Sequence, residues 1–314
     1  MGLSIIGTVA FDNIKTPFGE EQDILGGSAT HASMAARFFG PVSLISVVGD
    51  DFAAAQMQQL EQAQINTDGI VVLPGAKTFR WSGYYEYDMN QAHTLETQLN
   101  VLLTFQVKVP KAQQNDQFVF LGNLDPEIQG QILDQFHDPK FVALDTMNFW
   151  IQSKKPQLLK IMSRVNLLIL NDAEARQLTG LPNLVKAARK LIQLGPQWIL
   201  IKRGEHGATL FSEKSFFSVP AYPLEDVFDP TGAGDACAGG FMGFLSKSYR
   251  FDEAHLRQAV VAGSCLASFI VEDFGCRRLQ RLSADEIADR IQEFIRFSQV
   301  DFAVSLSEVH YNNS

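Results

Sequence analysis

Three small residues and a carboxylate stand together in the last third of the chain, where they open a stretch of apolar side chains at helical spacing. Gly232, Ala233 and Gly234 come directly before Asp235. Small residues let backbone N–H groups converge on an anion, and the N-terminus of a helix adds partial positive charge. A carboxylate beside such a site can take the proton of an attacking hydroxyl. The segment therefore predicts phosphoryl transfer, with Asp235 as the general base.

Two other phosphate-binding devices are excluded by spacing. A dinucleotide fingerprint, G-x-G-x-x-G, would need glycine where Cys237 stands, and no G-x-x-x-x-G-K motif occurs in the sequence. An isolated G-x-G-D would more often be a turn leading into a capped helix. The assignment therefore depends on what the remainder of the chain places around this segment.

The elements that must position these residues follow from hydrophobic periodicity. Short apolar runs alternate with longer stretches at helical spacing, which predicts βαβ units and a mainly parallel, doubly wound sheet flanked by helices. In such sheets ligands bind at the carboxyl ends of the strands. We expect one α/β domain over residues 1–314. The apolar runs cover residues 3–9, 42–48, 118–121, 141–144, 167–170 and 199–202.

One segment does not follow this order of strands and helices, because apolar and polar side chains alternate strictly along it. From Phe79 to Tyr87 the odd-numbered positions hold aromatic residues and one glycine, which predicts an amphipathic strand of an antiparallel sheet. A return strand over residues 94–105 would lie beside it. We expect residues 75–106, with residues 12–24, to form a small β-sheet lid over the main domain. An ordinary edge hairpin, or contact with a second subunit, would give the same pattern.

Composition and charge limit the kinds of molecule that the protein is expected to bind. The formal charge is -9 and the pI is near 5.2, so the chain lacks the clustered basic charge that holds nucleic acids or anionic membranes. There is no apolar run of membrane-spanning length and no signal-like N-terminus. Three cysteines without C-x-x-C spacing predict neither a disulfide framework nor a zinc site. We expect a cytoplasmic protein.

Further motifs match one family in type, order and spacing. Asp229, Thr231 and the Gly-Ala-Gly-Asp run fit a D-x-T-G-A-G-D signature. Residues 26–31, Gly-Gly-Ser-Ala-Thr-His, fit an N-terminal signature. The chain thus resembles the ribokinase, or PfkB, family of carbohydrate kinases, and the resemblance covers nearly its whole length. It implies a ribokinase-like fold and the use of ATP with Mg²⁺.

The resemblance also implies a role for each matched residue. Gly232, Ala233 and Gly234 would hold the transferred phosphoryl oxygens, and Asp12 would accept hydrogen bonds from two substrate hydroxyls. Asn171 and Glu174 would organise Mg²⁺ through water, although the same spacing fits a capping box. The remaining implied contacts are Gly26, Gly27, Ser28 and His31 with the acceptor; Lys202, Gly204, Gly207 and Thr231 with ATP; and Asp229 with a monovalent cation such as K⁺.

The sequence differs from the family motifs at two places, and both differences concern which substrate is bound. His31 stands where the family signature has an asparagine that contacts substrate. Residues 145–150 resemble the family's D-x-N-x-R region but lack its arginine. A positive charge near the phosphates would then have to come from elsewhere, and Lys202 and Arg80 are the candidates.

We therefore expect ATP-dependent phosphorylation of a sugar hydroxyl, most simply a primary one. An alternative is a nucleoside kinase, in which Trp81 or Tyr85 would stack on the base. A third reading is a sugar- or nucleotide-binding protein of the same fold without turnover. A homodimer through the lid sheet is compatible with the aromatic strand.

Overall fold

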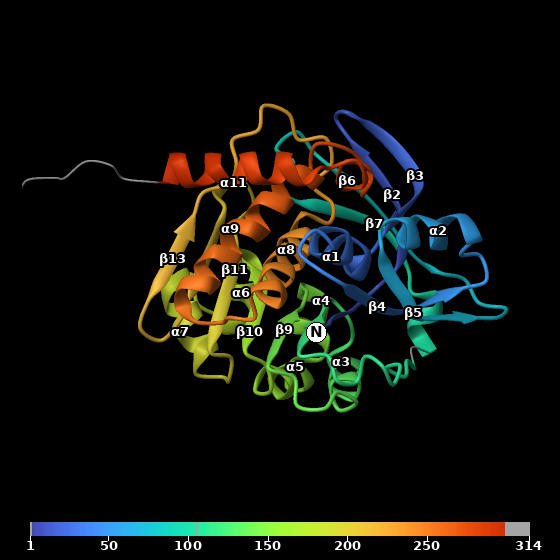
Figure 1. The fold of residues 1–314 in the computed structure, drawn as a ribbon, viewed down its shortest axis with the longest axis horizontal. Coiled ribbons are helices and arrows are strands. Elements are labelled where there is room, and N and C mark those ends of the chain that lie inside the picture. The colour runs from blue at the N-terminus through green and yellow to red at the C-terminus, as the bar shows by residue number, and fades with distance from the viewer. Residues whose placement is uncertain (1, 105, 299–314) are drawn as a thin grey trace, which may run out of the picture.

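The computed structural model describes residues 2–104 and 106–298. A nine-stranded sheet forms its centre, and seven of these strands are parallel (Figure 1). Two antiparallel strands complete one edge. In spatial order the strands are β13 (Phe216–Val219), β12 (Ala208–Phe211), β11 (Trp198–Lys202), β10 (Leu167–Asn171), β9 (Phe141–Asp145), β8 (Phe118–Leu121), β1 (Leu3–Ile6), β4 (Val42–Gly49) and β5 (Ile65–Leu73).

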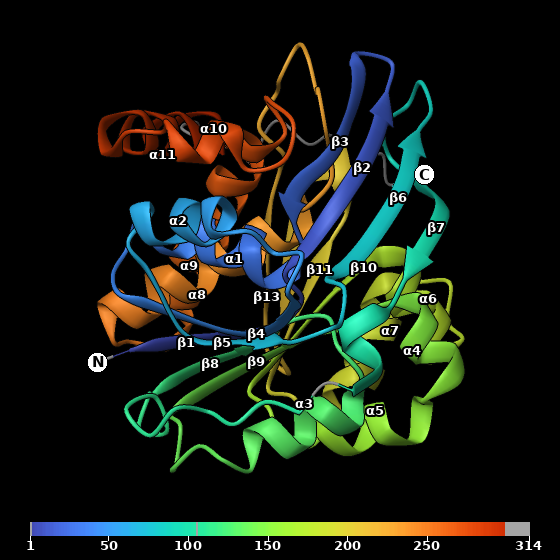
Figure 2. The same cartoon turned by 90° about the vertical axis from the view of Figure 1, so that its right-hand side faces the viewer.

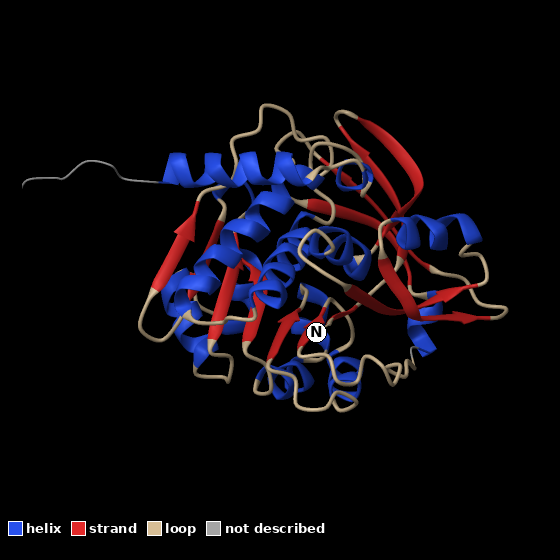
Figure 3. Ribbon diagram, viewed as in Figure 1, coloured by secondary structure: helices blue, strands red, loops and turns tan. Residues whose placement is uncertain are grey.

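Helices cover both faces of this sheet (Figures 2 and 3). One layer holds α1 (Ser28–Ala36), α2 (Ala54–Gln62), α8 (Ala233–Ser248), α9 (Glu253–Ile270), α10 (Arg277–Gln280) and α11 (Ala284–Ser298). The other holds α3 (Pro126–Leu133), α4 (Asn148–Ser153), α5 (Lys155–Met162), α6 (Asp172–Thr179) and α7 (Leu184–Ile192).

Alternating side chains of the central strands build two separate cores. Phe118 and Phe120 of β8 lie in one core, whereas Val119 and Leu121 lie in the other. Because successive strand residues point to opposite faces, a continuous apolar run is what a strand covered on both sides requires. The expected doubly wound α/β fold is confirmed.

A separate four-stranded sheet stands over the carboxyl ends of the central strands (Figure 2). Its order is β3 (Gly19–Gly26), β2 (Ala10–Thr16), β6 (Phe79–Tyr85) and β7 (Ala92–Gln98). We call it the lid sheet. It is mixed rather than antiparallel as expected, because β2 and β6 pair in parallel.

The return strand is shorter than predicted. β7 ends at Gln98, and a 3₁₀ turn (Asn100–Thr104) follows. Asn100 adopts a positive φ of 47°, and its side-chain amide donates to the carbonyl of Thr78 over 2.8 Å, which turns the chain back toward the main domain. Phe105, at the end of the predicted strand, lies outside the described residues, as does the segment 299–314.

Among residues 2–104 and 106–298, no helix is both long and apolar enough to span a bilayer.

Candidate active site

The candidate residues gather where strands of the main sheet end. β9 ends at Asp145, β10 at Asn171 and β11 at Lys202, and the three strands are neighbours in the sheet. Since parallel strands present their carboxyl ends at one edge, these side chains share one side of the molecule. The N-terminus of α8 and the lid sheet meet them there.

The start of α8 has the features of an anion site. Gly232 caps the helix with a left-handed φ of 78°, which favours glycine. Within the described part of the chain, the N–H groups of Gly234 and Asp235 have no hydrogen-bond acceptor. A side chain at Gly234 would meet the Lys202 ammonium, which lies 2.8 Å from the position of its Cβ. Two free N–H groups and a cation therefore converge at one helix end.

Lys202 is held there by an ion pair. Its Nζ lies 2.9 Å from Oδ2 of Asp145, and both side chains are largely buried. Burial alone would lower the pKa of Lys202, but the carboxylates of Asp145, Asp235 and Glu174 together raise it. The side chain is therefore a fixed positive charge beside the first turn of α8.

Asp235 combines a partly buried side chain with an unengaged carboxylate. No described residue donates a hydrogen bond to it. Burial raises the pKa of Asp235 to about 7; the Asp145 carboxylate adds to this rise and the Lys202 ammonium opposes it. A carboxylate with a pKa near the working pH is suited to general base catalysis.

Asn171 and Glu174 form a complete capping box at the start of α6. The Asn171 side chain accepts from the Glu174 N–H over 2.8 Å, and the Glu174 carboxylate accepts from the Asn171 N–H over 2.8 Å. Burial raises the pKa of Glu174 to about 7, with the Asp145 carboxylate adding to the rise. One oxygen of Glu174 remains free, so the box is compatible with binding water molecules of Mg²⁺.

The acceptor side of the site is built around Asp12 of β2. A Cβ on Gly26 would lie 1.8 Å from its Oδ2, and one on Gly27 would lie 2.4 Å from the carbonyl oxygen of Thr8. Burial raises the pKa of Asp12 to about 8, the charge of Asp229 adds to it, and the Gly27 N–H lowers it. The two glycines thus let the backbone close tightly around a buried carboxyl group.

Ser28 and His31 lie on α1 next to these glycines. The Ser28 hydroxyl accepts from the Thr8 N–H over 3.1 Å, which ties α1 to the end of β1. His31 is 1% exposed, and neither ring nitrogen has a hydrogen-bond partner among the described residues. Its ring packs against Gly232, and burial lowers its pKa to about 4, so it is neutral at physiological pH.

Gly204 and Gly207 shape the loop after β11. Both have positive φ, and a Cβ on Gly207 would lie 2.1 Å from the carbonyl oxygen of Val219. Near α8, the Asp229 carboxylate accepts from the N–H groups of Thr231 and Gly275 at 2.9 and 3.0 Å. Each Asp229 oxygen accepts one hydrogen bond and keeps a further lone pair, so the contact of Asp229 with a monovalent cation stays a prediction.

The inner face of the lid sheet carries an aromatic surface. Asp12 and Trp81 are register partners in the parallel pair β2–β6, so their side chains lie on the same face of the lid. The indole covers Gly83, because a Cβ there would lie 2.3 Å from the Trp81 ring, and the indole N–H donates to Thr94 over 3.2 Å. The ring is thus held over Gly83 and Thr94, on the same face of the lid as Asp12 of the neighbouring strand.

From the sequence we could assign no role to Asp145. We also could not decide whether Lys202 or Arg80 supplies the positive charge near the phosphates. Arg80 lies on the opposite face of β6 from Trp81, where it pairs with Asp23 and Asp51 and stacks on Phe11. Lys202 instead lies at the helix end. The place of Asp145 at the carboxyl end of an apolar run was the signal that could have identified it.

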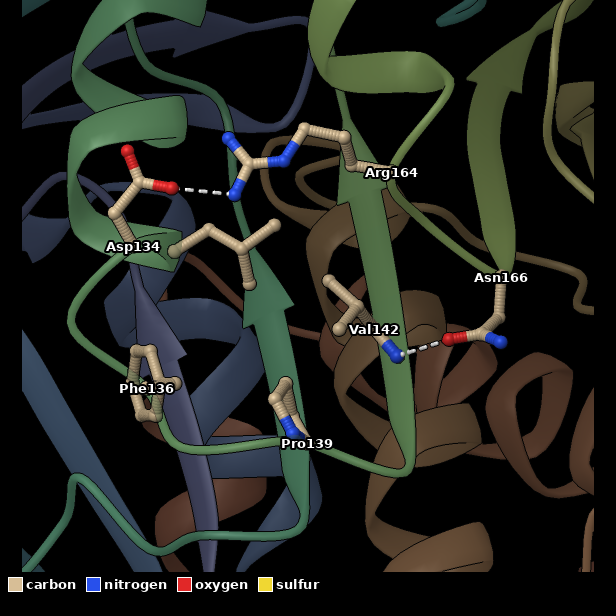
Figure 4. Close-up of a pocket in the computed structure, with 7 residues that line it drawn as sticks. Asp134, Phe136, Pro139, Val142, Arg164 and Asn166 are labelled. Carbon is tan, nitrogen blue, oxygen red and sulfur yellow. Dashed lines mark hydrogen bonds and ion pairs between the residues drawn. The ribbon is translucent and has the colours of Figure 1, made fainter.

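A surface hollow of about 440 Å³ lies at the opposite edge of the sheet (Figure 4). Its polar groups are engaged with one another: Arg164 pairs with Asp134 at 2.5 Å, and Asn166 accepts from the Val142 N–H at 2.8 Å. Because it adjoins the amino ends of β9 and β10, it is separate from the candidate site.

Sheet order, lid and a carboxylate at a free helix N-terminus together describe an α/β small-molecule kinase. A family model makes this specific, since the model described as pfkB family carbohydrate kinase matches residues 6–281. The chain belongs to this family.

Individual relatives include kinases that are named for nucleosides. The chain is 29% identical over 259 residues to a cytidine kinase of Thermococcus kodakarensis, covering 81% of this chain and 91% of the relative. Among solved structures, a Burkholderia thailandensis nucleoside kinase in complex with inosine has a TM-score of 0.74 at 20% identity, covering 94% and 99% of the two chains. A putative ribokinase II of E. coli, in complex with ATP and Mg²⁺, also has a TM-score of 0.74, at 18% identity, covering 94% and 99%. The protein is a kinase that phosphorylates a nucleoside or sugar with ATP.

Proposed function

We propose that this protein transfers the γ-phosphoryl group of ATP to the primary hydroxyl of a nucleoside. The observation that carries the nucleoside assignment is the pairing of Asp12 with Trp81 across β2 and β6. Ionised Asp12 can accept hydrogen bonds from two ribose hydroxyls, which would lower its raised pKa when the acceptor binds. An indole face in the next strand can stack on the attached base. The cytidine kinase relative supports the same acceptor class.

The chemical step proposed is an in-line displacement. Asp235 takes the proton of the attacking hydroxyl as its oxygen bonds to the γ-phosphorus and the bond to the ADP oxygen breaks. The N–H groups of Gly234 and Asp235, with the Lys202 ammonium, stabilise the charge on the transferred oxygens. Asn171 and Glu174 would hold water molecules of Mg²⁺, which neutralises phosphate charge when bound with ATP.

The remaining predicted contacts complete the proposal. Gly204, Gly207 and Thr231 would line the nucleotide side, where the backbone can approach the adenosine closely. His31 would offer its neutral ring to the acceptor. The lid sheet would cover both substrates and exclude water. Cytoplasmic location and a homodimer through the lid stay predictions.

A substrate panel tests the proposed acceptor. Cytidine, inosine, adenosine, uridine, ribose and fructose are compared with ATP and Mg²⁺ by coupled release of ADP. We expect a nucleoside to have the highest kcat/KM. A panel in which only free sugars are phosphorylated would contradict the nucleoside assignment, and binding without any release of ADP would contradict turnover itself.

Trp81→Ala is expected to separate nucleosides from ribose. Loss of a base-stacking ring costs about 1–3 kcal/mol, so KM for the preferred nucleoside should rise about tenfold or more. KM for ribose, which has no base, should stay near its wild-type value. Trp81→Phe keeps an aromatic face and serves as the matched control. Equal losses for ribose and nucleoside would show that Trp81 supports the lid rather than the base.

A further inference from the structure

Tyr85, the last residue of β6, reaches from the lid sheet to the segment that leads into α8. The Thr231 hydroxyl donates to the Tyr85 hydroxyl over 3.2 Å. Burial raises the pKa of Tyr85, the Thr231 hydrogen bond opposes the rise, and the charges of Asp229, Asp12 and Asp235 add to it. The phenol is therefore a neutral group whose hydroxyl is held by Thr231, at the segment that leads into α8.

A second contact joins the same hairpin to the loop after β11. Between β6 and β7, the Asn90 amide donates to the Glu205 carboxylate over 3.0 Å. The Asn90 oxygen also lies 3.2 Å from the position of a Cβ on Gly204. The loop is only one residue removed from Lys202. One lid hairpin thus touches both segments proposed to bind ATP.

The other edge of the lid is anchored independently. Arg277 of α10 donates two hydrogen bonds to the Glu21 carboxylate of β3, at 2.8 and 2.7 Å. This bidentate pair fixes β3 to the main domain, whereas the β6–β7 side meets the ATP segments through single hydrogen bonds. Opening of the cleft would therefore break the contacts of Tyr85 and Asn90 first.

We propose that Tyr85 is a positioning residue that couples seating of the acceptor to binding of ATP. Trp81 and Tyr85 lie on the same face of one strand, so an acceptor held against Trp81 fixes the strand that also holds Thr231. The nucleotide segments are then ordered before ATP arrives, and ATP in turn stabilises the closed lid. Such coupling is reciprocal, since each ligand must strengthen the other's binding by the same factor. The inference rests on the proposed function, since it assigns the two ligands to this cleft.

Tyr85→Phe tests the coupling, because it removes only the hydroxyl. Tyr84→Phe is the matched control, since it makes the same change on the opposite face of β6, where the Tyr84 ring stacks on His93. Calorimetry gives the Kd of a non-hydrolysable ATP analogue with and without cytidine. In wild type and Tyr84→Phe we expect cytidine to tighten the analogue. The tightening is the Kd without cytidine divided by the Kd with cytidine. In Tyr85→Phe this ratio should be about three- to tenfold smaller than in wild type, as expected for one lost hydrogen bond.

Two further readouts separate this proposal from the proposed function. Release of ADP without acceptor, relative to nucleoside phosphorylation, should rise in Tyr85→Phe because the lid excludes water less well. Hydrogen exchange of residues 79–98, measured without substrates, should be faster in Tyr85→Phe than in Tyr84→Phe. If wild type phosphorylates a nucleoside but both variants match it in coupling and exchange, the role of Tyr85 is overturned alone. If the wild-type protein phosphorylates nothing in the panel, the proposed function fails. The hydrogen-exchange result is then judged separately: equal exchange rates in Tyr85→Phe and Tyr84→Phe would overturn the role of the Tyr85–Thr231 contact as well.

Discussion

Asp235→Asn should remove most turnover while leaving the binding of ATP nearly unchanged. The amide keeps the shape of the side chain and the free N–H groups at the start of α8, but it cannot accept the proton of the attacking hydroxyl. General base catalysis contributes about 10²–10⁴-fold, so kcat should fall by a factor in that range. Steady-state kinetics with the preferred acceptor gives kcat, and calorimetry with an ATP analogue gives the affinity.

Asp285→Asn is the matched control for this change. Asp285 also lies in the first turn of a helix, α11, and it is exposed. Its substitution should leave kcat at the wild-type value. Wild-type turnover in Asp235→Asn would eliminate Asp235 as the base, and a large loss of ATP affinity would mean that the carboxylate acts on the nucleotide instead.

Lys202→Met should lower kcat about 10²–10³-fold and raise KM for ATP. The Lys202 ammonium lies beside the free N–H groups of α8, where charge would develop on the transferred oxygens, and loss of one preorganised donor at such a place has an effect of this size. Lys202→Arg keeps the charge and should retain part of the activity. The measurements are kcat and KM for ATP with saturating acceptor.

The same substitution leaves Asp145 buried without its partner, which costs about 3–5 kcal/mol of stability. The double variant Asp145→Asn with Lys202→Met removes both charges and should recover most of the wild-type Tm. It should nevertheless stay as inactive as Lys202→Met. A double variant with wild-type kcat would show that Lys202 serves only to neutralise Asp145.

Much of the fold could be predicted because burial on both faces leaves continuous apolar strands. β9 and β10 could be predicted for that reason, and so could the helix after Gly234. The lid could be predicted from the strict alternation of apolar and polar residues along β6. Its parallel pairing with β2 was not, because alternation fixes which face a side chain lies on but not the direction of the neighbouring strand.

The site could be predicted only where residue type and spacing define a local structural motif, such as the start of a helix. Gly232 to Asp235 do so, as do Asn171 and Glu174, because a helix start has a fixed geometry. The pair Asp145–Lys202 joins residues 57 positions apart on different strands. The contact between Tyr85 and Thr231 spans 146 positions. Such contacts depend on the order of strands in the sheet, which no local pattern specifies.

The pH dependence of kcat/KM for ATP, at saturating acceptor, tests the central claim most directly. If Asp235 is the base, the rate must rise with pH as this carboxyl loses its proton, with a midpoint near its pKa of about 7. The rise should persist in Glu174→Gln and move to lower pH in Asp145→Asn, because the Asp145 charge helps to raise the pKa of Asp235. A rate that stays flat from about pH 5.5 to 8.5 would contradict the assignment of the Asp235 carboxylate as the proton acceptor.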